Sequence, residues 1–73
     1  MYYQIYLLHL LDGTVIDVAE DYKLPMEKGL IGRFRSAEPH EILEIGDRQV
    51  GFAYVPKSSI VYISTGNVKK GEN

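Results

Sequence analysis

The two histidines, His9 and His40, are the side chains in this sequence best suited to metal binding or acid–base catalysis. A zinc site needs three or four ligands, and the potential ligands nearest His40 in the sequence are Glu38 and Glu41. The histidines do not follow an H-x-x-x-H spacing, and there is no cysteine to act as a thiolate ligand or nucleophile. We therefore predict no metal site, no catalytic histidine and no cofactor.

Carboxylates and serines are the other groups that could perform catalysis. Asp17, Glu20 and Asp21 form a local acidic cluster, but acid–base work by a carboxylate needs a pocket that raises its pKa. A charged, solvated hairpin edge that resists aggregation explains the cluster better. Ser58 and Ser59 belong to no G-x-S-x-G pattern and are typical turn residues. We predict that the protein is not an enzyme.

A short basic segment is the best candidate for nucleic-acid binding. Lys28, Arg33 and Arg35 could contact phosphates while the neighbouring Phe34 stacks on a base. At helical spacing, however, Phe34 belongs to a buried face, and the three basic residues then form a solvated one. The net charge of −2 also gives no surplus of positive charge, which phosphate contacts normally require. Nucleic acid is therefore a less favoured partner than a second copy of the chain, which is discussed below.

The elements that would position these residues begin with a hairpin. Two β-type runs, residues 2–11 and 14–20, flank Asp12-Gly13, which is a strong signal for a tight turn between paired strands. The first run, about ten residues long, is too short to span a bilayer as a helix and has no basic segment before it. We expect no membrane association and a cytoplasmic location.

The pattern changes after Pro25, where apolar residues recur at helical spacing. Met26, Leu30, Ile31 and Phe34 predict an amphipathic helix over residues 26–36, with these four side chains on its buried face. Two glycines within this range each weaken a helix by roughly 1 kcal/mol against alanine, so a structured loop is the alternative.

Three more strands are predicted at residues 40–45, 49–55 and 60–64, separated by turns at 46–48 and 56–59. The order β-β-α-β-β-β predicts a mainly β fold, a small bent antiparallel five-stranded barrel with one inserted helix. The 73 residues allow one domain, which we place at residues 1–65. Residues 66–73 are polar and are expected to form a flexible tail.

The fifth predicted strand is apolar on both faces. Strict alternation places Ile60 and Tyr62 on one face and Val61 and Ile63 on the other. One face can line the core, and the other needs cover from a neighbouring copy or from the helix at 26–36. The candidate residues for an interface between copies are Phe52, Tyr54, Ile60, Val61, Tyr62 and Ile63.

Two segments resemble the Sm-like (LSm) family of small β-barrels. The segment YLLHLLDGTVIDVAED (residues 6–21) is similar to the family's first two strands, and YVPKSSIVYIS (residues 54–64) to its second motif. The resemblance implies a barrel whose subunits form rings by pairing the fourth strand of one copy with the fifth strand of the next. The residues that hold RNA in the family are absent, because no Asn follows Asp21 and Pro56-Lys57 replaces the Arg-Gly of the second motif.

Three functions follow from these patterns. The first is a non-enzymatic structural or interaction module that forms a homo-oligomer, because a small core without disulfides is commonly supplemented by oligomerisation. The second is a small RNA- or DNA-binding protein of Sm-like type. The third is an enzyme, which would need a site at a subunit interface.

Overall fold

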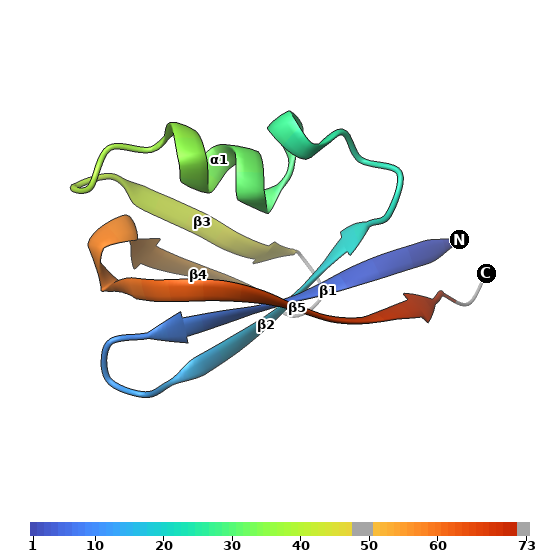
Figure 1. Ribbon diagram of the computed structural model, residues 1–73, viewed down its shortest axis with the longest axis horizontal. Helices are drawn as coiled ribbons and strands as arrows, with labels where there is room; N and C mark the ends of the chain where they lie inside the picture. The colour runs from blue at the N-terminus through green and yellow to red at the C-terminus, as the bar shows by residue number, and fades with distance from the viewer. Residues whose placement is uncertain (48–50, 72–73) are drawn as a thin grey trace.

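The computed structural model describes residues 1–47 and 51–71 of the chain. These residues form strands β1 (Tyr2–Leu10), β2 (Val15–Asp21), β3 (Ile42–Asp47), β4 (Gly51–Pro56) and β5 (Ile60–Lys70) (Figure 1). Helix α1 (Leu30–Ser36) follows the 3-10 turn η1 (Met26–Lys28), and a second 3-10 turn, η2 (Lys57–Ser59), joins β4 to β5. The predicted order of strands and helix is confirmed.

The strands belong to two antiparallel sheets. One sheet has the order β2-β1-β5 and the other pairs β3 with β4. The predicted mainly β fold is therefore confirmed, but the described residues do not form one closed five-stranded barrel. No ladder joins β2 to β3 or β4 to β5 among them, so the two sheets do not close on each other by hydrogen bonds, and α1 lies over β3 (Figure 1).

The first hairpin forms at the predicted turn. Gly13 has φ +89°, and the Leu10 N–H donates to the Thr14 carbonyl oxygen at 2.9 Å. The Asp12 carboxylate accepts a hydrogen bond from the Thr14 N–H at 2.9 Å. Hydrogen bonds from the Thr14 side chain and backbone lower the pKa of Asp12 below its ordinary value. The turn thus carries its own stabilising carboxylate.

The helical segment is shorter than predicted. Gly29 is extended, with φ −92° and ψ −169°, and separates η1 from a seven-residue α1. Leu30 is fully buried and Phe34 packs against the core, as expected, but Met26 is 58% exposed. The assignment of Met26 to the buried face is therefore wrong. Gly32 permits this arrangement, because a Cβ at that position would overlap the Met26 carbonyl oxygen where η1 folds back on α1.

The fifth strand contains a bulge that breaks the predicted alternation. Leu10 pairs with Ile60 but His9 pairs with Tyr62, which leaves Val61 as an extra residue. Consequently Ile60 is buried, whereas Val61 and Tyr62 are both exposed. The predicted sharing of a face by Ile60 and Tyr62 is wrong. Helix α1 also does not cover the second face, because these exposed side chains lie outside the core.

The fifth strand is also longer than predicted. It continues to Lys70, and Tyr2 pairs with Lys70 in the register with β1. The Gly71 N–H donates to the Met1 carbonyl oxygen at 2.7 Å. Residues 66–70, which were expected to belong to a flexible tail, are instead part of β5, because the start of β1 provides backbone partners for these polar residues. The predicted turn residue at 48, the start of the predicted fourth strand at 49–50 and the last tail residues at 72–73 lie outside the described part of the chain.

The core lies between the two sheets and beneath α1. Among the described residues it consists of Leu8, Val18, Leu30, Leu43, Ile45, Val55 and Ile60. In β2, Val18 is buried and Ile16 half-buried on one face, as expected for alternating residues of a strand, while Val15 and Asp17 are exposed on the other. This small core leaves many large apolar side chains at the surface, and these define the candidate sites.

Candidate functional site

The predicted interface residues separate into two groups in the structure. Ile60 is buried and Ile63 packs against the core, so these two side chains belong to the interior. The other four are exposed at the surface, with 45% of Phe52, 64% of Tyr54, 56% of Val61 and 55% of Tyr62 accessible. The exposed members lie on β4 and at the start of β5.

Both strands that carry these residues have a free edge within the described part of the chain. β4 forms a ladder with β3 only, and β5 with β1 only. An edge without a partner strand presents unpaired N–H and C=O groups, which can accept a strand from another chain. Exposed apolar side chains and free edges therefore occur on the same two strands.

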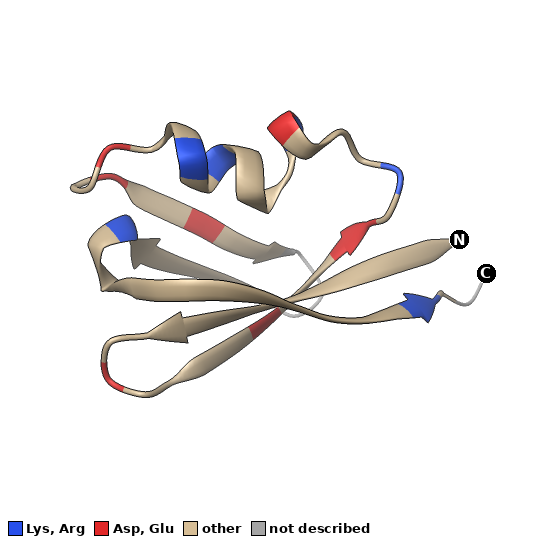
Figure 2. Ribbon diagram, in the orientation of Figure 1, with Lys and Arg blue, Asp and Glu red and all other residues tan. Residues whose placement is uncertain are grey.

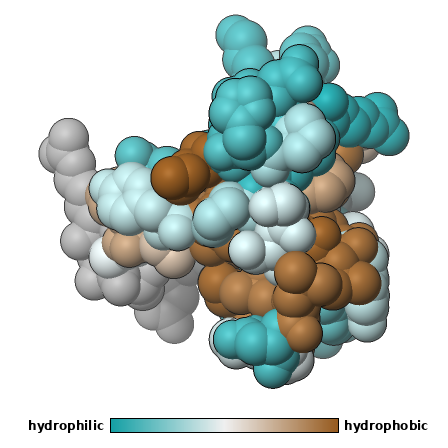
Figure 3. Space-filling model, turned by 90° about the vertical axis from the view of Figure 1, so that its left-hand side faces the viewer, coloured by the Kyte–Doolittle hydropathy of each residue, from teal (hydrophilic) through white to brown (hydrophobic). Residues whose placement is uncertain are grey.

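A further exposed residue, Leu11, joins this surface at one end of the molecule. Leu11 is 72% exposed, and its N–H donates to the Ser59 carbonyl oxygen at 2.9 Å, which holds it beside the start of β5. Leu11 and Tyr54 line the same open pocket of about 300 Å³. We call Leu11, Tyr54 and Val61 the apolar end. Figure 3 shows hydrophobic surface on this side of the molecule, between hydrophilic regions above and below it.

Leu11 is not among the residues that the sequence pattern predicts for the interface. The sequence feature that indicates exposure of Leu11 is its position directly before the Asp-Gly turn. β1 ends at Leu10, so the alternation of inward and outward side chains does not apply to Leu11.

The predicted basic segment does not form a surface for base stacking. Lys28, Arg33 and Arg35 are exposed, and the Arg33 guanidinium donates to the Glu44 carbonyl oxygen at 2.9 Å. The ring of Phe34 packs against the core, and the Lys57 ammonium lies 4.8 Å from its centroid. Acidic positions on β3 and on the loop after α1 lie near the basic ones (Figure 2). The surface around α1 is therefore of mixed charge.

His9 lies on the outer face of the three-stranded sheet. Its ring stacks on Tyr62 with centroids 3.9 Å apart, and its Nε2 is 2.9 Å from the Ser64 hydroxyl. A serine hydroxyl beside an imidazole also occurs in the nucleophile–base pairs of enzymes. Here the stacking on Tyr62 and the hydrogen bond to Ser64 account for the position of the His9 ring as packing on the sheet surface. Within residues 1–47 and 51–71, no three His, Asp or Glu side chains converge as metal ligands.

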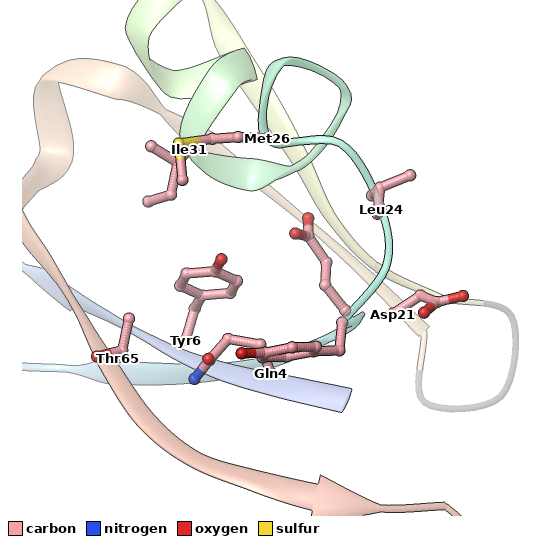
Figure 4. Close-up of a pocket in the computed structure, with 9 residues that line it drawn as sticks. Gln4, Tyr6, Asp21, Leu24, Met26, Ile31 and Thr65 are labelled. Atoms are coloured by element: carbon pink, nitrogen blue, oxygen red, sulfur yellow. The ribbon is translucent and has the colours of Figure 1, made fainter. Parts of the chain in front are cut away.

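A cavity of about 310 Å³ lies between α1 and the inner face of the three-stranded sheet (Figure 4). The inner face of β1 changes along its length from Leu8, which is fully buried, to Tyr6 and then Gln4 at the cavity. β1 thus extends beyond the core, and the part of its inner face that lies outside the core carries Tyr6 and Gln4. The opposite wall is apolar and includes Met26 and Ile31.

Glu20 projects into this cavity from β2. Its Oε2 accepts a hydrogen bond from the Leu30 N–H at 2.5 Å and so satisfies a free donor at the start of α1. The placement of Glu20 in a solvated cluster with Asp17 and Asp21 is therefore wrong, because Glu20 is half-buried on the opposite face of β2. Burial, followed by the charge of Glu20, raises the pKa of the Tyr6 phenol above its ordinary value.

Comparison of the chain with protein-family models, with curated proteins and with solved structures gives no match. In the described part of the chain, no helix has the length and apolar character needed to cross a membrane. The candidate sites of the protein are therefore the apolar end with its strand edges and the cavity beneath α1.

Proposed function

We propose that the protein is a non-enzymatic interaction module that assembles with copies of itself by strand pairing. The observation that carries this proposal is that β4 and β5 each have a free edge, among the described residues, beside exposed apolar side chains. Pairing β4 of one copy with β5 of the next would satisfy backbone groups on both edges. The Sm-like resemblance implies the same pairing, in which the fourth strand of one copy joins the fifth strand of the next to form a ring.

The lengths of the two strands indicate where the proposed contact would lie. β4 has six residues and β5 has eleven, so a ladder with β4 covers about half of β5. The first half of β5 carries the exposed Val61 and Tyr62, whereas the second half ends in Lys69 and Lys70. The contact is therefore placed at residues 60–65, where it also buries the apolar end.

The size of the chain is compatible with such an interface. A stable interface buries about 800 Å² on each partner, which is roughly one seventh of this chain's surface of 5434 Å². A core of seven side chains among the described residues is small, and contact with a second copy supplements it. Because Leu11, Tyr54 and Val61 are each more than half exposed, they can contribute apolar area to that contact.

The test is the solution mass, measured by light scattering after size exclusion over a range of protein concentrations. The wild-type protein is expected to have a stable multiple of 8.3 kDa. Val61→Lys places a charge in the contact and is expected to shift the mass towards that of a monomer. Val68→Lys is the matched control, because Val68 is 47% exposed on the same strand but lies outside residues 60–65.

Two outcomes contradict the proposal. A wild-type protein that remains a monomer at high concentration excludes self-assembly as the function. Equal dissociation of the Val61→Lys and Val68→Lys variants contradicts the placement of the contact at the start of β5.

A further inference from the structure

We propose that the cavity beneath α1 binds a small primary amine in its ammonium form, with a short aliphatic chain. The polar side of the cavity would hold the nitrogen, and the apolar wall would cover the carbon chain. The proposal concerns the inner face of the three-stranded sheet and does not depend on self-assembly.

The charge of the cavity favours a cation. Its lining includes the carboxylates of Glu20 and Asp21, and none of its nine lining residues is Lys, Arg or His. Asp21 points away from the cavity in Figure 4, and its carboxylate accepts a hydrogen bond from the Lys23 N–H at 2.9 Å. Glu20 is therefore the carboxylate that faces a ligand. A partly buried negative charge without a cationic partner in the same cavity attracts a positively charged group.

The hydrogen-bonding groups of the cavity favour a ligand that donates several hydrogen bonds. The Gln4 amide nitrogen donates to the carbonyl oxygens of Ile5 and Gly66, each at 3.0 Å, so its side-chain oxygen is left as an acceptor. The Tyr6 hydroxyl points into the cavity (Figure 4). Together with Glu20, these residues offer three oxygen acceptors. An ammonium group has three N–H donors and no acceptor, which matches this set.

The opposite wall favours a short carbon chain. Leu24 and Met26 line the cavity and are 40% and 58% exposed, so a ligand would cover apolar surface that otherwise faces water. The volume of about 310 Å³ is at the lower end of the range for ligand pockets. An amine of four or so carbon atoms is therefore a better match than a large cofactor.

The experiment is a titration of the ¹⁵N-labelled protein with n-butylammonium, followed by NMR. Butyrate and n-butanol serve as ligand controls of the same length and of opposite or no charge. We expect saturable shifts of the Glu20, Leu30 and Ile31 amides with butylammonium only. A Kd in the millimolar range is expected, because the ligand has few non-hydrogen atoms.

The variants test the assigned roles. Glu20→Gln keeps an acceptor for the Leu30 N–H but removes the charge, and binding is expected to weaken at least tenfold. Asp17→Asn is the matched control, because it removes one carboxylate from the exposed face of the same strand and should leave the Kd unchanged. Tyr6→Phe removes only a hydroxyl and is expected to weaken binding several-fold, so it decides the question if Glu20→Gln does not fold.

Three results would overturn the proposal. The first is a lack of saturable shifts with butylammonium, and the second is equal shifts with butyrate. The third is an unchanged Kd in the folded Glu20→Gln or Tyr6→Phe variant.

Discussion

Replacing Gly46 by alanine should destabilise the fold severely. Gly46 has φ +121°, a conformation that costs a residue with a side chain about 1–3 kcal/mol. A Cβ there would also overlap the Gly51 carbonyl oxygen, which lies across the β3–β4 ladder. Displacing that carbonyl would disturb the end of the β3–β4 pairing, at a further cost of about 1 kcal/mol. We expect a total loss of about 3 kcal/mol, from a stability of about 4–11 kcal/mol for a chain of this length.

Substitutions at two other glycines separate the cost of positive φ from the cost of steric overlap. Gly13 also has positive φ, at +89°, but a Cβ there meets nothing within 4 Å, so Gly13→Ala should cost only about 1 kcal/mol. Gly66 does not have positive φ, and a Cβ there would make an ordinary contact of 3.4 Å with Ile5, so Gly66→Ala should change stability by less than about 0.5 kcal/mol.

Thermal unfolding followed by circular dichroism, at one protein concentration, measures the series. For a domain of this size, 1 kcal/mol corresponds to roughly 4–8 °C in Tm. The Tm of Gly46→Ala should therefore fall by at least about 12 °C, and that of Gly13→Ala by about 4–8 °C. If the two variants melt within a few degrees of each other, the steric argument at the β3–β4 ladder is refuted.

Three further predictions concern the core, the cavity and the helix surface. Leu30→Ala should cost about 2–5 kcal/mol in chemical denaturation, because Leu30 is fully buried; a smaller loss would contradict its place in the core. The pKa of the Tyr6 phenol is raised in the folded protein, so as pH rises the phenol ionises in the unfolded chain before it ionises in the folded one. The free energy of unfolding should therefore fall as pH rises above about 10. Tyr6→Phe should lessen this fall, and an unchanged pH dependence would refute the assignment. In fluorescence anisotropy with a labelled oligonucleotide, Arg33→Ala with Arg35→Ala should reduce any binding; binding that is unchanged would show that these arginines do not contact nucleic acid.

Local patterns in the sequence were sufficient for the first hairpin and for the faces of β2. The Asp12-Gly13 turn forms as predicted because one residue accepts a local hydrogen bond and the other has no Cβ to oppose positive φ. The strict alternation of Ile16, Asp17 and Val18 between inside and outside follows from the period of a strand, which depends on neighbouring residues alone.

Contacts between distant residues decided the helix boundary and the cavity. Spacing correctly predicted burial of Leu30 and packing of Phe34 against the core, but α1 begins only after Gly29, where the Glu20 carboxylate from another element meets the Leu30 N–H. A carboxylate ten positions away has no signature in the helical pattern. Its inward orientation, and therefore the polar side of the cavity, depends on how β2 lies beneath α1.

The fifth strand shows most clearly which features local sequence determines and which features tertiary contacts determine. The sequence by itself determined that residues 60–64 form an apolar strand, because β-branched and aromatic residues follow a turn. Only the tertiary structure decided which side chains are buried, because the bulge at Val61 is a property of the register between β5 and β1. After a second register shift between Tyr6 and Gln4, pairing with β1 extends β5 to Lys70, since β1 provides hydrogen-bond partners that the polar composition of residues 66–70 does not reveal.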